Sequence, residues 1–120
     1  LNVLTINNLL QPLVAMNYIV ISSNYRGVDG GTGQDEFGGD EVQDIVQLIH
    51  HARKLPEWDR RNIYMFGWSR GGMMTLLALK YGVDVNAIAL GAPLIDLTLN
   101  LDHADEKREA WVRRVIPDYD

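Results

Sequence analysis

The sequence predicts an α/β fold, because short apolar runs of strand-forming residues alternate along the chain with segments of helical periodicity. The apolar runs are residues 18–23, 63–66 and 87–90. Runs without a polar face are typical of a mostly parallel sheet that helices cover on both faces. Six of the eleven glycines lie from Gly27 to Gly39, and three more lie in residues 67–72, so the glycines indicate a long loop and a tight turn.

Helical periodicity and the residues that end helices predict four helical segments. These segments are residues 7–16, 42–52, 70–81 and 104–115. The first contains Pro12, which a helix tolerates only near its first turn. The second ends before Pro56, and the third ends at Gly82, in the position that glycine favours after a helix. Residues 24–40 are expected to form a loop.

Length and composition limit the class of protein. With 120 residues, 47% hydrophobic and 22% charged, the chain has the size and composition of one globular domain. Its net charge of −5 argues against nucleic acid or an anionic membrane as a partner, because both attract basic surfaces. No apolar run approaches the length of a membrane span, and the absence of cysteine excludes disulfides. The opening residues show no signal-peptide pattern, so we expect a cytoplasmic rather than a secreted protein.

The turn after the second strand carries the residues that indicate chemistry. Residues 63–66 lead directly into Gly67-Trp68-Ser69-Arg70-Gly71-Gly72, and a helical pattern follows. A Gly-x-Ser-x-Gly pattern between a strand and a helix can be a simple turn, but it is typical of a serine held in strained backbone angles as a nucleophile. Gly67 and Gly71 are expected to prevent collisions between strand and helix, and Gly72 to allow close packing. The N–H of Arg70 would then donate to an oxyanion at the helix N-terminus, beside Ser69.

Further residues extend this pattern into a family resemblance. In order along the chain they are Asn24-Tyr25-Arg26-Gly27, Phe37-Gly38-Gly39-Asp40, Asp44, Asp59-Arg60-Arg61-Asn62-Ile63 and residues 67–75. Across residues 7–96 the series resembles the catalytic domain of prolyl oligopeptidase-type serine peptidases, which have the α/β-hydrolase fold. The resemblance implies a Ser-Asp-His hydrolase with Ser69 as nucleophile, acting on peptide bonds or, as a carboxylesterase-type alternative, on ester bonds. We expect no cofactor and no metal.

Three residues are candidates for substrate binding, namely Trp68, Tyr25 and Arg26. Trp68 and Arg70 differ from the residues that are frequent at these positions in the family, which leaves the acyl and leaving-group preferences open. Tyr25 and Arg26 follow the predicted strand at residues 18–23, at the end where open α/β sheets bind ligands. Arg26 also has a structural interpretation, since it could hold the loop by pairing with a nearby acid.

The histidine base and the orienting acid that a nucleophilic serine needs are expected outside this chain. Only Asp96 and His103 follow Ser69 in a suitable order, and the resemblance instead implies an acid and a histidine on later strands, past Asp120. We therefore predict that Asp96 and His103 form no triad with Ser69.

The resemblance also implies a further strand that precedes Leu1 in the chain. In the sheet, this strand would lie between the strands at residues 18–23 and 63–66. We therefore expect residues 1–120 to be part of one incomplete catalytic domain, and a poor catalyst alone. The alternative is a non-catalytic module that serves as an interaction unit. In either case the unpaired strand edges predict association with a second copy.

Two other clusters have structural interpretations. His50 and His51 are neighbours on a helix, about 100° apart, whereas metal-binding pairs on helices are three or four residues apart. We expect one ring to face partly inward and the other to face solvent. Five acids before and within the same helix lack the alternating ligands of a calcium loop and are expected to stabilise the positive end of the helix. These acids are Asp35, Glu36, Asp40, Glu41 and Asp44.

Overall fold

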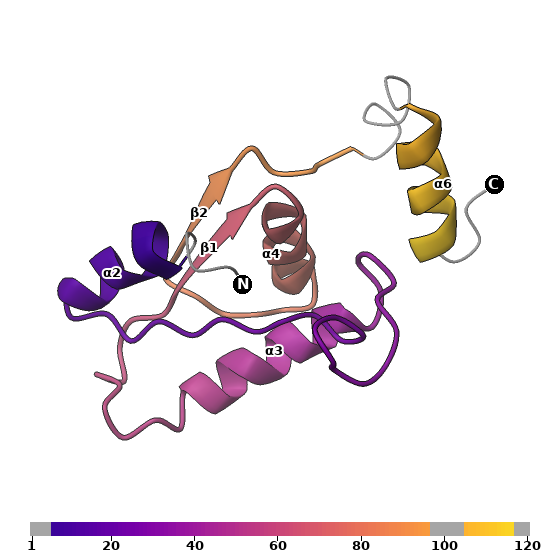
Figure 1. Ribbon diagram of the computed structural model, residues 1–120. Helices are drawn as coiled ribbons and strands as arrows, with labels where there is room; N and C mark the ends of the chain where they lie inside the picture. The colour runs from indigo at the N-terminus through magenta and orange to yellow at the C-terminus, as the bar shows by residue number, and fades with distance from the viewer. Residues whose placement is uncertain (1–5, 97–104, 117–120) are drawn as a thin grey trace.

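The computed structural model describes residues 6–96 and 105–116, and its elements confirm the α/β class (Figure 1). Two parallel strands, β1 (Tyr64–Trp68) and β2 (Ala87–Gly91), form the sheet. The helices are the π-helix η1 (Ile6–Leu10), α2 (Gln11–Ala15), α3 (Glu41–Ala52), α4 (Arg70–Lys80) and α6 (Glu106–Val115). None of these helices is long and apolar enough to cross a membrane.

Pro12 and Gly82, which the sequence singled out, lie near helix boundaries, and a side-chain cap begins α6. Pro12 lies in the first turn of α2, the part of a helix that tolerates proline. Gly82 follows α4 with a φ of 82°, the left-handed conformation that glycine adopts after a helix. The Asp105 side chain accepts a hydrogen bond from Arg108 N at 2.8 Å and so caps α6.

The two strands are joined through α4 and are fixed to one another at both ends. Their register runs from Tyr64 opposite Ala87 to Trp68 opposite Gly91. Before the strands begin, Asn86 N donates to Ile63 O at 2.8 Å, and after β1 ends, Ser69 N donates to Gly91 O, also at 2.8 Å. The pairing therefore holds Ser69 at the carboxyl end of the sheet, the end at which α/β proteins bind ligands.

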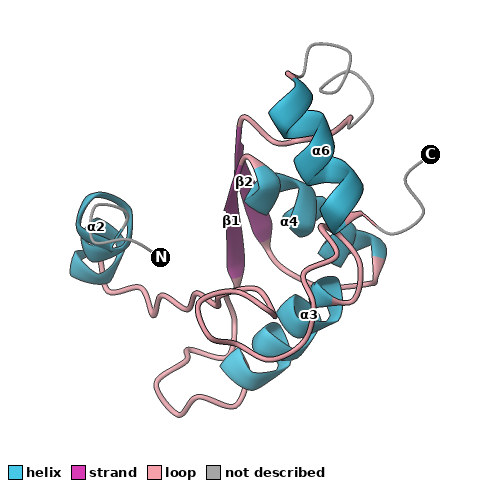
Figure 2. Cartoon of the chain, turned by 45° about the vertical axis from the view of Figure 1, so that its right-hand side comes forward, coloured by secondary structure: helices cyan, strands magenta, loops and turns pink. Residues whose placement is uncertain are grey.

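The core lies between the sheet and the helices α3 and α4. Val42 from α3 and Met74 and Ala78 from α4 are buried, and Met65 from β1 packs against them. Figure 2 shows α3, α4 and α6 on one side of the sheet and α2 on the other. The α4 side is thus the packed side of the sheet, and it carries the buried part of this chain.

The prediction of a strand at residues 18–23 is wrong, because these residues make no strand pairing within the described part of the chain. The segment begins beside β1, where the Tyr18 and Tyr64 rings meet edge to face with centroids 6.1 Å apart. Its large side chains, among them Ile19 at 49% exposure, stay accessible to solvent. Apolar composition alone does not make a strand, because the backbone N–H and C=O groups need a neighbour that satisfies them.

Candidate active site

Ser69 alone makes the turn from β1 into α4. Its φ of 52° and ψ of −118° confirm the strained backbone expected at this residue, a conformation that costs on the order of 1–3 kcal/mol. Neighbouring backbone groups hold the turn in place. Ser69 N donates to Gly91 O at 2.8 Å, and Ser69 O accepts from Gly72 N at 3.0 Å and from Leu94 N at 3.1 Å. The conformation is therefore imposed by the strand pairing on one side and the helix on the other.

Two of the three glycines of the turn have the steric role that the sequence predicted. A Cβ on Gly67 would collide with the carbonyl oxygen of Gly71 and lie 2.6 Å from Thr75 Oγ1. A Cβ on Gly72 would lie 2.6 Å from Pro93 Cβ. The prediction for Gly71 is wrong, because a Cβ there would meet no atom within 4 Å. The carbonyl of Gly71, rather than its missing side chain, takes part in the close contact.

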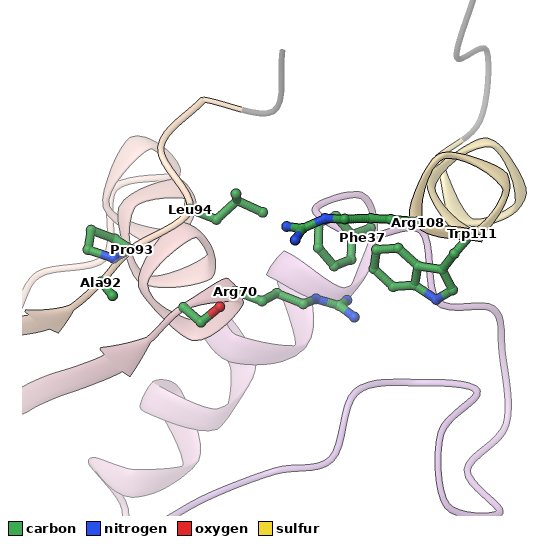
Figure 3. A pocket seen from close by; sticks show the side chains of 8 residues that line it. Phe37, Arg70, Ala92, Pro93, Leu94, Arg108 and Trp111 are labelled. Carbon is green, nitrogen blue, oxygen red and sulfur yellow. The ribbon is translucent and has the colours of Figure 1, made fainter. Parts of the chain in front are cut away.

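A cavity of about 390 Å³ opens beside Ser69 (Figure 3). It is lined by Phe37, Ser69, Arg70, Ala92, Pro93, Leu94, Arg108 and Trp111. The rings of Phe37 and Trp111 meet edge to face with centroids 4.8 Å apart, and Figure 3 shows Arg108 reaching from α6 toward Leu94. Apolar and aromatic walls with a few polar groups are typical of ligand-binding cavities.

The Arg70 side chain leaves the turn and enters an ion-pair cluster. Its Nη1 donates to Asp35 Oδ2 at 2.7 Å, and its Nη2 donates to Asp35 Oδ1 at 2.5 Å and to Glu41 Oε1 at 2.8 Å. The guanidinium also lies 4.1 Å from the centre of the Tyr25 ring and 4.4 Å from that of Phe37. The hydrogen bonds from Arg70 hold the pKa of the Asp35 carboxyl below its usual value.

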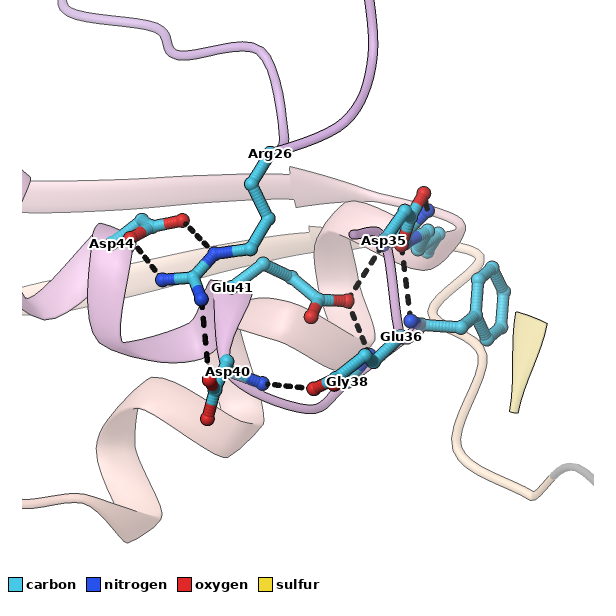
Figure 4. Close-up of polar contacts among 9 residues, drawn as sticks. Arg26, Asp35, Glu36, Gly38, Asp40, Glu41 and Asp44 are labelled. Carbon is cyan, nitrogen blue, oxygen red and sulfur yellow. Dashed lines mark hydrogen bonds and ion pairs between the residues drawn. The ribbon is translucent and has the colours of Figure 1, made fainter. Parts of the chain in front are cut away.

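Arg26 forms a second cluster, which does not line the cavity (Figure 4). Its Nε and Nη2 donate to the two Asp44 carboxylate oxygens at 2.8 and 2.6 Å, and its Nη1 donates to Asp40 Oδ2 at 3.2 Å. Hydrogen bonds from Arg26 lower the pKa of Asp44. Of the two interpretations of Arg26, the contacts therefore support the structural one, in which it holds the loop against the start of α3.

The other two candidates for substrate binding also lie off the cavity. The Tyr25 ring lies against the Arg70 guanidinium, and burial raises the pKa of its hydroxyl. The Trp68 ring is 65% exposed and covers Gly91, its partner across the sheet, where a Cβ would overlap the ring.

The acids near α3 differ from the prediction in their main partners. Glu41 and Asp44 do lie in the first turn of α3, which agrees with a structural role. Their hydrogen bonds, however, go to Arg70 and Arg26, which lie 29 and 18 residues away in the chain. The sequence suggested that Arg26 pairs with a nearby acid, but no periodicity links Glu41 with Arg70, so it gave no signal for that pair.

The histidines of α3 contribute nothing to the site. His50 and His51 are both exposed, with ring centroids 6.3 Å apart, so the expectation that one faces inward is wrong. Residues 50 and 51 fall in the last turn of the helix, beyond the part that packs on the core. No group of three or more metal-ligating side chains occurs among residues 6–96 and 105–116.

Of the two residues that could complete a triad in this chain, the structure describes Asp96 but not His103. Asp96 follows β2 and does not line the cavity beside Ser69. His103 lies outside the described residues, so its separation from Ser69 stays a prediction.

Comparisons with known proteins agree with the resemblance in the sequence. The model of the prolyl oligopeptidase family matches residues 5–118. A Bacillus subtilis (strain 168) protein described as "Uncharacterized peptidase YtmA" is 27% identical over 103 residues. The match covers 85% of this chain and 40% of that protein, so the chain spans well under half the length of this relative. No solved structure matches the chain.

Proposed function

Because this chain belongs to the prolyl oligopeptidase family, we propose that it carries the nucleophile of a hydrolase that cleaves peptide bonds, with Ser69 as that nucleophile. The observation that carries the proposal is the position of Ser69, which combines a φ of 52° at a strand-to-helix turn with a place in the wall of the cavity. A strained residue at the carboxyl end of a parallel sheet is the arrangement that exposes a serine hydroxyl to a substrate.

The chemistry follows from the groups around Ser69. Its Oγ attacks the carbonyl carbon of the scissile bond and gives its proton to a histidine base, and the carbonyl oxygen becomes an oxyanion. Because Arg70 is the first residue of α4, its N–H has no carbonyl within its own helix to bond. That N–H and the positive end of α4 are suited to stabilise the oxyanion. Collapse of the tetrahedral intermediate releases the amine, which takes the proton from the histidine. Water then hydrolyses the acyl-serine ester to a carboxylic acid, and Ser69 Oγ regains its proton.

The base and the acid belong to other parts of the protein in this proposal. A histidine that accepts the Ser69 proton must approach Oγ within about 3 Å, and a carboxylate must orient it. Asp96, the acid considered above together with His103, does not line the cavity. We therefore assign neither role to a residue of this chain.

The test is labelling of the intact protein with a fluorophosphonate, which reacts with activated serines. We expect Ser69→Ala to abolish labelling and to lower turnover of a peptide substrate at least about 1,000-fold. Ser22→Ala, on a segment away from the cavity, should label at the wild-type rate. Labelling that persists in Ser69→Ala would refute the assignment.

The same assay separates the alternatives. An intact protein that hydrolyses aryl esters and not peptide amides is a carboxylesterase. One that is folded but neither reacts with the probe nor turns over either substrate is a non-catalytic module.

A further inference from the structure

Arg70 takes part in the candidate site through both its backbone and its side chain. Its N–H lies at the start of α4, next to Ser69, and its side chain forms part of the cavity wall. The far end of that side chain is held by two carboxylates from a different region of the chain, Asp35 and Glu41. The residue that follows the proposed nucleophile is therefore fixed from two directions.

We propose that Asp35 and Glu41 are positioning residues for the reaction at Ser69, acting through Arg70. They hold the guanidinium in one place, and with it the first turn of α4 and the adjoining cavity wall. This inference rests on the proposed function, because it concerns the geometry of the same site.

The burial and contacts of the cluster leave Arg70 little freedom. Its side chain is 18% exposed, that of Asp35 is 20% exposed, and that of Glu41 is fully buried. Asp35 binds the guanidinium with both oxygens, a fork-to-fork geometry that fixes the plane of the group. The Tyr25 and Phe37 rings lie against that plane. A lysine could not replace these contacts, because its ammonium offers neither the fork nor the flat face.

The cluster also links the site to the loop before α3. Asp35 belongs to the loop and Glu41 is the first residue of α3, while Phe37 between them lines the cavity. Phe37 N donates to Asp35 Oδ1 at 3.0 Å, and Gly38 N donates to Glu41 Oε1 at 2.6 Å. The two carboxylates therefore fix the position of Phe37 as well as that of Arg70, and both residues face the space beside Ser69.

The two carboxylates use their oxygens differently, which makes the proposal testable by amide substitutions. Asp35 offers both oxygens to Arg70, so Asp35→Asn must turn an NH₂ group toward a guanidinium that has no acceptor for it. Glu41 accepts both of its hydrogen bonds at Oε1, and its buried Oε2 has no partner among the described residues. Glu41→Gln can keep both bonds by placing its carbonyl at the Oε1 position.

The Arg26 cluster supplies a matched control. Arg26 and Asp44 form a two-pronged ion pair of similar geometry, between the same loop and the same helix, but neither residue lines the cavity. Asp44→Asn removes a carboxylate from a guanidinium in the same way as Asp35→Asn. A role that is merely structural predicts equal effects of the two substitutions on activity.

The experiment measures kcat and KM for a peptide substrate, the fluorophosphonate labelling rate and Tm in the intact protein. We expect Asp35→Asn to lower kcat and labelling about 10- to 100-fold, with KM within about threefold, because misplaced groups lose interactions made in the transition state. Glu41→Gln should lower kcat less than about fivefold. Asp44→Asn should lower Tm like Asp35→Asn and leave kcat within about twofold.

Several outcomes would overturn the inference. One is equal losses of kcat in Asp35→Asn and Asp44→Asn, and another is a loss in Asp35→Asn that appears only in KM. If Asp35→Asn does not fold, Arg70→Lys is compared with Arg26→Lys, and only the former should lower kcat. Ser69→Ala, measured in parallel, separates the two proposals. An inactive Ser69→Ala beside an Asp35→Asn that keeps the wild-type kcat refutes the positioning role alone, whereas a Ser69→Ala with wild-type activity refutes the proposed function.

Discussion

The two faces of β1 differ sharply, although the strand is only five residues long. Toward α4 it presents Met65 and Gly67, and the latter approaches the helix so closely that no side chain fits. Toward the other face it presents Tyr64, Phe66 and Trp68, which are 51%, 47% and 65% exposed. The α4 face thus carries the geometry around Ser69, while the other face carries apolar surface. We infer that substitutions on the first face change the fold of the site and that those on the second change association.

The largest effect is expected at Gly67. Gly67→Ala places a methyl group against the Gly71 carbonyl and Thr75 Oγ1, and these belong to a helix that is packed against the core. We expect the free energy of unfolding of the intact protein to fall by about 3 kcal/mol or more, as measured by urea denaturation.

Gly71→Ala is the matched control for this prediction. A Cβ on Gly71 meets open space, and alanine is preferred to glycine inside a helix by up to about 1 kcal/mol. Gly71→Ala should therefore leave stability unchanged or raise it slightly. Equal destabilisation by the two substitutions would contradict the difference between the glycines.

The next effect concerns the exposed face of β1. Tyr64, Phe66 and Trp68 form a row of large apolar side chains on one face of a strand, and Tyr18 lies against the first of them. Such a face, beside a sheet edge, favours pairing with another chain. We expect the isolated chain of residues 1–120 to sediment as a dimer or larger species in analytical ultracentrifugation.

Phe66→Lys should shift that species toward monomer, because the charge would be buried on association. Tyr81→Lys changes an aromatic residue that is 58% exposed at the end of α4, away from this face, and should leave the distribution unchanged. A wild-type chain that sediments as a monomer at micromolar concentration would contradict the prediction.

The difference between local and distant contacts explains which features the sequence could predict. The strands near 63–66 and 87–90, the helices and the strained backbone at Ser69 follow from local patterns of apolar residues and glycine, and all are present. The strand predicted at residues 18–23 failed because pairing depends on a neighbour that composition does not reveal. The Arg70–Asp35 pair joins residues 35 apart in the chain, and only the folded chain brings them together.

The smallest change in the free energy of unfolding is expected on lowering the pH. It concerns residues on the packed side of the sheet. Hydrogen bonds from Arg70 hold the pKa of Asp35 below its usual value, so the ionised carboxylate favours the folded state. That contribution is fully present above the unfolded pKa of about 4 and is lost as the pH falls through the lower pKa of the folded state. The free energy of unfolding should therefore decline from about pH 5 downward.

Urea denaturation of the intact protein between pH 6 and pH 3 measures this decline. Asp35→Asn carries no titrating group at this position, so its stability should fall less steeply with acid than that of the wild type. The stability of Asp44→Asn should also fall less steeply with acid than that of the wild type, because Arg26 lowers the pKa of Asp44. Phe66→Lys, on the exposed face of β1, should retain the wild-type slope, because it removes neither carboxylate. If the free energy of unfolding of Asp35→Asn falls with pH as steeply as that of the wild type, the Arg70 cluster is equally stable with Asp35 protonated. The prediction that this ion pair stabilises the fold would then be refuted.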